Sequence, residues 1–327
     1  MPSWQRPRRR LKFFLNETVD WKQLLLLERM VEIRQYLNEQ RLIVETALKK
    51  YMLKAQGPFA RHLESMRYSL FVGGKRLRPI LCLAAAAAID PDRSLRENLL
   101  PVACALECIH TYSLIHDDLP AMDNDDLRRG KPTNHKLFGE AGAILAGDGL
   151  LTWAFDLLTG RESALPPERL LQITHLIARA AGSLGMVGGQ ALDIAYENQD
   201  FPFEILQTIH RSKTGALLTC AVQAGAVGAG AVPKETECMI DYGNQIGLAF
   251  QIIDDLLDAT ATTEQLGKTA GGDAKRGKAT YPAYFGIEAS KKKALDAVTA
   301  AKEALAGFDE KAAPLRAIAD YIYCRSN

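Results

Sequence analysis

Apolar residues recur at spacings of three and four along almost the whole chain, and this pattern constrains the fold more than any other feature. The segment VEIRQYLNEQRLIVETALKKYML is typical, because its Val, Ile and Leu residues fall on one side of a helix. No segment alternates convincingly between apolar and polar residues with the two-residue period of a half-buried strand. The sequence therefore predicts an all-α protein.

Glycine and proline residues interrupt this pattern and divide the chain into roughly ten expected helices. The interruptions fall at Gly57-Pro58, Gly73-Gly74, Asp90-Pro91, Pro120, Gly130 to Pro132, Pro166-Pro167, Pro202 and Pro233. No long linker separates the helices, so we expect one domain over residues 30–327, although the length would also suffice for two. Alanine-rich stretches such as GALLTCAVQAGAVGAGA predict helices that approach closely in its interior.

The first residues, MPSWQRPRRRLKFFLNETVDW, are basic and carry only a short apolar run, so they lack the hydrophobic core of a signal peptide. We expect residues 1–29 to form a poorly ordered basic arm. No stretch of about eighteen apolar residues stands out elsewhere, so no membrane span is expected. A net charge of +1 gives no electrostatic reason to expect nucleic acid as a partner.

The six cysteines are scattered and form no CxxC pair, which indicates reduced core residues of a cytoplasmic protein. Cys104 and Cys108 lie one helical turn apart with His110 close by, so a zinc site is an alternative. Such a site would lack the second ligand pair of a structural zinc centre.

Two aspartates of the segment FQIIDDLLD share one face of a strongly apolar helix. Asp254 and Asp258 are four residues apart, which is about 400° of rotation, and Gln251 lies one turn before Asp254. Two carboxylates about 4 Å apart repel by roughly 4 kcal/mol even at an effective dielectric constant of 20, so the pair needs a counter-charge. Mg²⁺, which prefers carboxylate and phosphate oxygens, would supply it.

The first acidic cluster along the chain, HDDLPAMDNDD, precedes this second one and packs five aspartates into ten residues. Asp117 and Asp123 are six residues apart, so a regular helix would place them on different sides. Pro120 should end the helix near Asp118 and let the chain bring Asp123 back beside Asp117. An EF-hand loop opening at Asp123 does not fit, because it would need glycine where Arg128 stands. The sequence assigns no role to Asp125 and Asp126.

Basic residues occur beside turns at several places. The motif GGKRLRP places Lys75 and Arg78 at a glycine turn that opens a helix, where free backbone N–H groups also favour anions, although it lacks the spacing of a Walker A loop. Further cations are Arg128 and Arg129 after the first acidic cluster, and Lys213 in RSKTGALL. Together they predict two bound anionic groups, one reached by the aspartates through metal and one held directly by Lys75, Arg78 and Arg129.

The segment TTEQLGKTAGGDAKRGKAT is polar and glycine-rich in an otherwise compact helical chain, which is typical of a lid or a binding loop. It contains Lys268 and Lys278. His110 lies seven residues before Asp117, roughly two helical turns, and so points toward the expected metal site.

The motifs DDLPAMDNDDLRRG, GGKRLRP, GGQALD, SKTG and FQIIDDLLD, together on an all-α chain, resemble those of the trans-type short-chain isoprenyl diphosphate synthases, and most of all the bacterial farnesyl diphosphate synthases. The resemblance runs from about Met30 to the C-terminus. It implies a helical bundle around a deep central cavity, a homodimer, and three Mg²⁺ ions, or Mn²⁺ in their place, between the two aspartate motifs.

The resemblance also implies roles for single residues. The metal ligands would be Asp117, Asp123 and Asp254, supported by Asp118 and Asp258. The allylic diphosphate would contact Arg128, Lys213, Thr214, Gln251, Lys268 and Lys278. Isopentenyl diphosphate would contact Gly74, Lys75, Arg78, His110 and Arg129. Lys213, Thr214 and Gln251 would stabilise the carbocation, and Tyr112 would limit the length of the product, although an ideal helix places Ser113 nearer the Asp117 face.

The expected activity is head-to-tail condensation of isopentenyl diphosphate with dimethylallyl and geranyl diphosphate, which gives the C15 farnesyl product. Geranylgeranyl diphosphate synthesis, with a C20 product, is the alternative. A class I terpene cyclase or a head-to-head, squalene-synthase-like enzyme would have no use for the GGKRLRP pocket, and a non-catalytic subunit of a heteromeric synthase would usually have lost an aspartate motif.

Overall fold

The computed structural model describes residues 21–160, 162–260 and 279–325, and almost all of the regular secondary structure there is helical. The α-helices are α1 (Trp21–Tyr51), α2 (Ala60–Phe71), α3 (Leu77–Ile89), α4 (Arg93–Asp117), α5 (Asn134–Phe138), α6 (Glu140–Thr159), α7 (Pro167–Ala181), α8 (Met186–Ala195), α9 (Phe203–Ile209), α10 (Ala216–Gly228), α11 (Pro233–Thr260), α14 (Tyr281–Phe285), α15 (Ile287–Ala304) and α16 (Ala313–Cys324). Short turns of other helix types are η2 (Gly57–Phe59) and η4 (Glu310–Ala312), both 3₁₀, and the π-helix η3 (His210–Gly215). The all-α prediction is confirmed.

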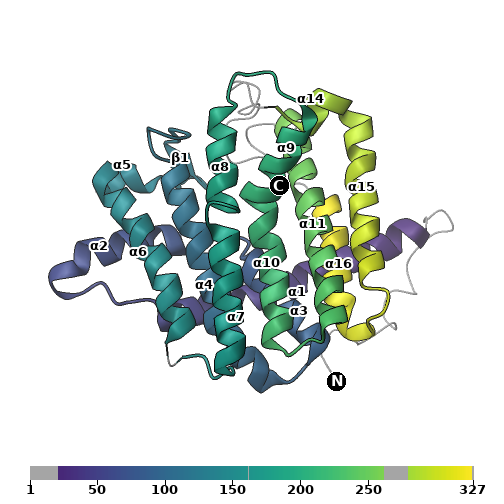
Figure 1. The fold of residues 1–327 in the computed structure, drawn as a ribbon, viewed down its shortest axis with the longest axis horizontal. Helices are drawn as coiled ribbons and strands as arrows, with labels where there is room; N and C mark the ends of the chain where they lie inside the picture. The colour runs from purple at the N-terminus through teal and green to yellow at the C-terminus, as the bar shows by residue number, and fades with distance from the viewer. Residues whose placement is uncertain (1–20, 161, 261–278, 326–327) are drawn as a thin grey trace, which may run out of the picture.

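The long helices stand side by side in one bundle, and α1 crosses them (Figure 1). Helix α4 packs against α3 and α6, and α11 packs between α10 and α15. Helix α3 is buried along most of its length, as is α4 from Leu99 onward. The inner helices α3, α4, α10 and α11 therefore form the core on which the acidic and basic motifs are mounted.

The interior helices approach each other as closely as the alanine-rich segments predict. A Cβ atom added at Gly225 of α10 would lie 2.0 Å from the carbonyl oxygen of Cys82 in α3, so only glycine permits this contact. Cys82, Cys104, Cys108 and Cys220 are free and buried in the same core, as expected. Burial raises the pKa of the Cys108 thiol to about 12, and no group of three His, Cys, Asp or Glu side chains that could hold a zinc ion is found among the described residues.

Most predicted breaks coincide with the ends of helices. Pro167 and Pro233 each occupy the first position of a helix, where the missing N–H costs nothing. Two details differ from the sequence expectation. Helix α1 begins at Trp21, ahead of residue 30, where the sequence predicts the start of the domain. The strands β1 (Leu127–Arg128) and β2 (Lys131–Pro132) form a small antiparallel hairpin. Strands of two residues are too short for an alternating pattern to be visible.

Residues 1–20 lie outside the described part of the chain, so the boundary of the basic arm stays a prediction. The premise of the membrane expectation, that no stretch of about eighteen apolar residues stands out, is corrected by three helical segments. The segments Arg93–Asp117, Glu140–Thr159 and Pro167–Ala195 are each long and apolar enough to cross a membrane by length and composition alone. For α4, 72% of that apolar window is buried inside the fold, so its composition already has a structural explanation.

A buried ion pair fixes the segment before α3 to the middle of α4. Arg76 Nη1 donates to Glu107 Oε1 at 2.7 Å, and the two side chains are 1% and 2% exposed. Arg76 Nη2 donates to the Leu70 carbonyl at 2.7 Å, and the Arg76 backbone is left-handed, with φ of 53°. The pair therefore holds the GGKRLRP turn in a conformation that an isolated chain would disfavour.

Glu107→Gln is expected to lower the free energy of unfolding by about 3 kcal/mol, because it leaves the buried Arg76 cation with only the more distant Glu45 carboxylate, 3.9 Å from Nε, as a counter-charge. The matched control is Glu97→Gln on the same helix, where the Arg93–Glu97 pair at 3.2 Å has side chains that are 82% and 61% exposed. That change should cost less than about 1 kcal/mol. Urea unfolding of both variants measures the difference, and equal losses would contradict a special role for the buried pair.

Candidate active site

The chain turns sharply at the end of α4 and brings two aspartates together. Helix α4 ends at Asp117, and the backbone N–H of Asp123 donates to the Asp117 carbonyl at 2.8 Å. The Leu119 carbonyl accepts from Met122 at 2.9 Å and from Asn124 at 3.0 Å, and Asn124 has a φ of 52°, a conformation that Asn tolerates well. The structure thus shows the turn that Pro120 predicts.

Carboxylates of the first cluster repel one another in this arrangement. Burial raises the pKa of Asp117 to about 6, and Asp123 and Asp118 add to the rise, whereas Lys213 opposes it. The site can therefore accept positive charge, and its hard oxygen donors fit a cation such as Mg²⁺. No three His, Cys, Asp or Glu side chains of the described residues lie close enough together to hold a metal ion, so the predicted three-aspartate set is not assembled in this conformation.

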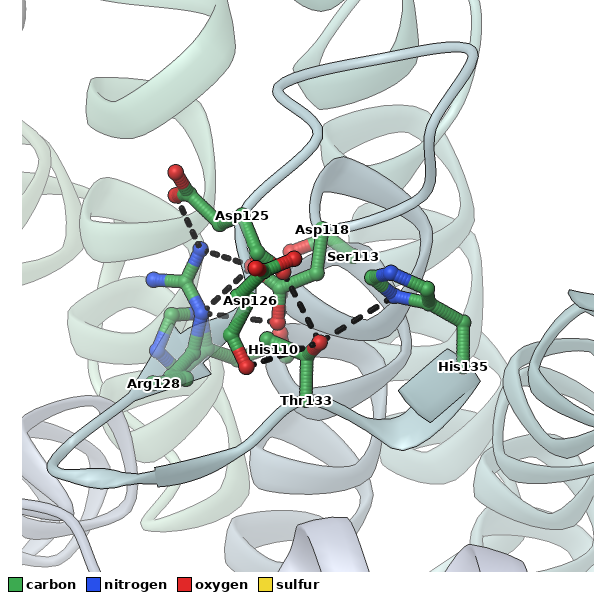
Figure 2. Close-up of polar contacts among 8 residues, drawn as sticks. All are labelled: His110, Ser113, Asp118, Asp125, Asp126, Arg128, Thr133 and His135. Atoms are coloured by element: carbon green, nitrogen blue, oxygen red, sulfur yellow. Dashed lines mark hydrogen bonds and ion pairs between the residues drawn. The ribbon is translucent and has the colours of Figure 1, made fainter. Parts of the chain in front are cut away.

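Asp118 points away from a metal role and toward an arginine. Its carboxylate accepts from Arg128 Nε at 2.8 Å and also pairs with Arg128 Nη2, while the Asp118 side chain is only 4% exposed (Figure 2). Asp125 lies on the other side of Arg128, with Oδ2 3.9 Å from Nη2. The hairpin that follows Asp126 therefore carries Arg128 back to the base of the first cluster.

The two aspartates without a predicted role are part of this hairpin. The Asp125 carbonyl accepts from the Thr133 hydroxyl at 2.8 Å, and the Asp126 carbonyl accepts from the Thr133 N–H at 3.0 Å (Figure 2). The Asp126 carboxylate pairs with Lys136 at 2.6 Å. Asp125 and Asp126 thus close the turn by which the chain presents Arg128 and Arg129.

The second acidic cluster lies on the last turns of α11, and its members differ in their surroundings. Asp254 Oδ1 pairs with Arg325 Nη2 at 2.5 Å, and 39% of the Asp254 side chain is exposed. Asp255 and Asp258, by contrast, are buried. Arg325 also donates to the Phe250 carbonyl at 3.0 Å and stacks over the Phe250 ring, so the C-terminal segment reaches the predicted metal ligand.

Basic side chains gather beside Asp254. Partial burial and the neighbouring Arg325 lower the pKa of Lys75, Asp254 raises it, and Arg129 lowers it further. Burial lowers the pKa of Arg78 to about 10, although Glu107 and Asp254 oppose the shift. The Arg78 Nε atom is buried and has no hydrogen-bond partner among the described residues. The predicted set of Lys75, Arg78 and Arg129 is therefore one cluster, and its mutual repulsion favours an anionic ligand.

His110 belongs to the same cluster. Burial lowers its pKa well below the ordinary value, and Arg78, Arg129 and Arg128 lower it further. The imidazole is therefore neutral at physiological pH and can offer a ligand one N–H donor and one acceptor.

The motif RSKTG forms a π-helix, η3, which contains both Lys213 and Thr214. A π-turn widens the helix and displaces carbonyls from the usual pattern, which is why such turns are frequent at functional sites. Lys213 Nζ pairs with Asp193 Oδ2 of α8 at 2.6 Å. A Cβ at Gly189 would lie 2.2 Å from the Lys213 backbone nitrogen, so the GGQALD motif supplies the glycine that this close packing requires.

The remaining predicted site residues include Gln251, Tyr112, Ser113 and two lysines. Gln251 Nε2 donates to Asp255 Oδ1 at 2.9 Å. Tyr112 is 6% exposed and its ring meets His116 edge-on, whereas Ser113 is half-buried and donates to the His110 carbonyl at 2.9 Å. Lys268 and Lys278 lie outside the described residues.

Sequence reasoning missed three residues that complete the site. Arg325 belongs to no motif, and its contact with Asp254 joins positions that are far apart in the chain. Asp193 is the last residue of GGQALD, a motif that indicates the family but whose spacing alone predicts no ion pair. The contact of Asp255 with Gln251 could have been predicted, because Asp255 lies four residues after Gln251 and therefore on the same helical face.

The sequence matches the polyprenyl synthetase family over residues 60–313. This chain belongs to that family. It is 47% identical over 298 residues to a farnesyl diphosphate synthase of Geobacillus stearothermophilus, covering 91% of this chain and 99% of the relative. It is 50% identical over 293 residues to a geranylgeranyl diphosphate synthase of Cyanophora paradoxa, covering 89% and 96%.

A solved structure supports the same polyprenyl synthetase assignment. The FPP/GFPP synthase from Zymomonas mobilis superimposes with a TM-score of 0.80 at 38% identity and covers 90% of this chain and 100% of that one. The predicted fold of the isoprenoid synthases is therefore confirmed. The chain is a prenyltransferase, and the family implies that a divalent metal takes part in the transfer. The roles of single site residues stay predictions.

Proposed function

We propose that the chain condenses isopentenyl diphosphate with dimethylallyl diphosphate and then with geranyl diphosphate, giving farnesyl diphosphate. The cluster of Lys75, Arg78 and Arg129 around neutral His110 carries this proposal, because it gathers positive charge beside Asp254 that a second diphosphate would neutralise. The relative in Geobacillus stearothermophilus supports the C15 product.

The chemistry follows from the positions of charge. Mg²⁺ held by Asp117, Asp123 and Asp254, three ions in all and replaceable by Mn²⁺, would neutralise charge on the departing diphosphate. Arg128 and Lys213 would bind the allylic diphosphate and orient its C–O bond. That bond breaks with both electrons on oxygen, the double bond of isopentenyl diphosphate forms the new C–C bond, and the released diphosphate takes the proton that is lost. No protein base is therefore needed.

The π-helix and Gln251 would stabilise the carbocation that exists between the breaking of the C–O bond and the formation of the C–C bond. The Lys213 and Thr214 carbonyls and the Gln251 amide oxygen are dipoles fixed by the fold, so they need no reorganisation as the charge develops. Lys268 and Lys278 would close over the substrates and exclude water.

Further parts of the proposal concern the setting of the enzyme. The protein acts as a cytoplasmic homodimer, takes small-molecule substrates and binds no nucleic acid. Geranylgeranyl diphosphate is the second candidate product, and the 50% identity to the Cyanophora paradoxa enzyme is the observation that favours it.

One assay tests the proposal and separates the two products. The purified full-length protein is incubated with Mg²⁺, isopentenyl diphosphate and each of the C5, C10 and C15 allylic diphosphates, and the product length is measured by chromatography. Elongation of C5 and C10 but not C15 is expected. Elongation of C15 would establish the C20 alternative, and no elongation of any substrate would defeat the proposal.

Gly74→Ala is expected to raise the KM for isopentenyl diphosphate about tenfold, because the loss of one charge-assisted hydrogen bond costs about 1.5 kcal/mol. The added Cβ would lie 2.8 Å from Arg129 Nη1 and displace the guanidinium. Gly73→Ala is the matched control, since Gly73 also has a positive φ, of 114°, but a Cβ there meets nothing within 4 Å. Steady-state kinetics of both variants decide, and equal KM values would show that Arg129 does not contact this substrate.

A further inference from the structure

Asp255 is buried between α11, α14 and η3, and both of its carboxylate oxygens accept hydrogen bonds within the fold. Oδ1 accepts from Gln251 Nε2 at 2.9 Å, and Oδ2 accepts from the backbone N–H of Tyr281 at 2.9 Å. The residue is 2% exposed, unlike its neighbour Asp254. A carboxylate held in this way is poorly placed to bind a metal ion and well placed to orient its donors.

Three separate elements fix this carboxylate. It projects from α11, it binds the first residue of α14, and it lies beside η3, where His210 Nε2 is 3.8 Å from Oδ2. The Tyr281 ring stacks on His210 with ring centroids 5.5 Å apart and an angle of 18°. Asp255 therefore joins the return of the chain after residue 278 to the π-helix that carries Lys213 and Thr214.

The hydrogen bond between Gln251 and Asp255 determines which end of the Gln251 amide faces Asp255. A carboxylate can only accept, so the amide nitrogen must point at Oδ1, and the amide oxygen must point away from it. An amide oxygen stabilises a nearby positive charge, whereas the NH₂ group destabilises it. The orientation of this one amide thus decides whether Gln251 assists or opposes the formation of a carbocation.

We propose that Asp255 is a positioning residue that locks Gln251 with its amide oxygen toward the developing carbocation. This inference rests on the proposed function, because it needs the cation formed by ionisation of the allylic diphosphate. It separates the members of the second acidic cluster, since Asp254 would bind metal and Asp255 would act through Gln251.

Asp255→Asn tests the proposal, because an asparagine cannot accept from Gln251 and Tyr281 on both terminal atoms. The kcat of elongation should fall about thirtyfold, while the Mg²⁺ concentration for half-maximal rate and both KM values stay within twofold of the wild type. Asp254→Asn should instead raise the Mg²⁺ requirement. Asp241→Asn, at an exposed position of the same helix, should leave kcat unchanged. An Mg²⁺ requirement raised by Asp255→Asn as much as by Asp254→Asn would overturn the proposal.

A double-mutant cycle separates positioning from a general structural role. In a Gln251→Met background, Asp255→Asn should lower kcat less than twofold, because there is no amide left to orient. The same thirtyfold loss in both backgrounds would refute the proposal. Wild-type protein in the same assay separates failure of the Asp255 proposal from failure of the proposed function. If the wild type itself does not elongate any substrate, the proposed function is wrong.

A compensating variant keeps the test open if Asp255→Asn lowers the melting temperature strongly. In the double variant Gln251→Glu with Asp255→Asn, the NH₂ group introduced at position 255 would donate to the carboxylate introduced at position 251. The amide oxygen at position 255 would still accept from the backbone N–H of Tyr281. An oxygen again faces the cation, so kcat should return to within about fivefold of the wild type. A double variant that folds but remains as slow as the single variant would contradict the proposed mechanism.

Discussion

Replacing Asp117 with Asn is expected to lower kcat of chain elongation about a thousandfold. The change removes a charge but almost no volume, and the turn at the end of α4 survives, because it depends on the Asp117 carbonyl and not on its side chain. If the carboxylate holds metal that neutralises the departing diphosphate, its loss removes about 4 kcal/mol of transition-state stabilisation. Steady-state kinetics at saturating Mg²⁺ measure the effect.

Unfolding experiments supply the control for this variant. The folded-state pKa of Asp117, about 6, lies above the ordinary value of 3.8, so the folded wild type loses stability as pH rises through this range. Asn removes that loss, and without metal the variant should be at least as stable as the wild type at pH 7. Asp126→Asn, whose side chain is 70% exposed in the same turn, should leave kcat within twofold. A kcat of Asp117→Asn within tenfold of the wild type would exclude Asp117 as an essential ligand.

Local rules of chain geometry predict those parts of the fold that depend on neighbours in sequence. The apolar period of three and four residues identifies the helices, and Pro120 identifies the turn that joins Asp117 to Asp123. The cluster of Lys75, Arg78 and Arg129 could also be foreseen, because these basic residues lie beside a glycine turn and directly after the first acidic cluster. The helices and the turn depend on residues within a few positions of one another, whereas Lys75, Arg78 and Arg129 belong to two motifs, GGKRLRP and DDLPAMDNDDLRRG.

Contacts between distant segments could not be predicted in this way. The pairing of Arg325 with Asp254 joins the C-terminal segment to α11, and nothing in the sequence around Arg325 indicates a partner. The π-helix at Lys213 packs closely against Gly189 of α8, and the sequence of RSKTG alone does not indicate this tertiary contact. The buried Arg76 is a further example, because the motif GGKRLRP identifies it as a basic residue at a turn but does not indicate Glu107 as its partner.

Tyr112→Ala is expected to shift the main product from C15 to C20 or longer. Tyr112 is buried on α4, five residues before Asp117, and Asp117 adds to the rise that burial causes in the pKa of its phenol, so the two side chains are close. A growing chain whose diphosphate is bound at Asp117 would extend along α4 and meet this ring. Truncation to Ala removes the obstacle, and chromatography of the dephosphorylated products measures their length.

Two further variants decide whether the Tyr112 ring itself stops the chain. Tyr112→Phe keeps the ring and loses only the hydroxyl, so its product should remain C15. Tyr112→Ala should also lower the free energy of unfolding by about 3 kcal/mol through the cavity that it creates, and the assays therefore need a temperature at which all variants are folded. Ser113 is the competing position, because it lies half-buried on the next face of α4. If Ser113→Phe shortens the product to C10 while Tyr112→Ala leaves it at C15, the growing chain passes Ser113 and the stopper assignment to Tyr112 is wrong.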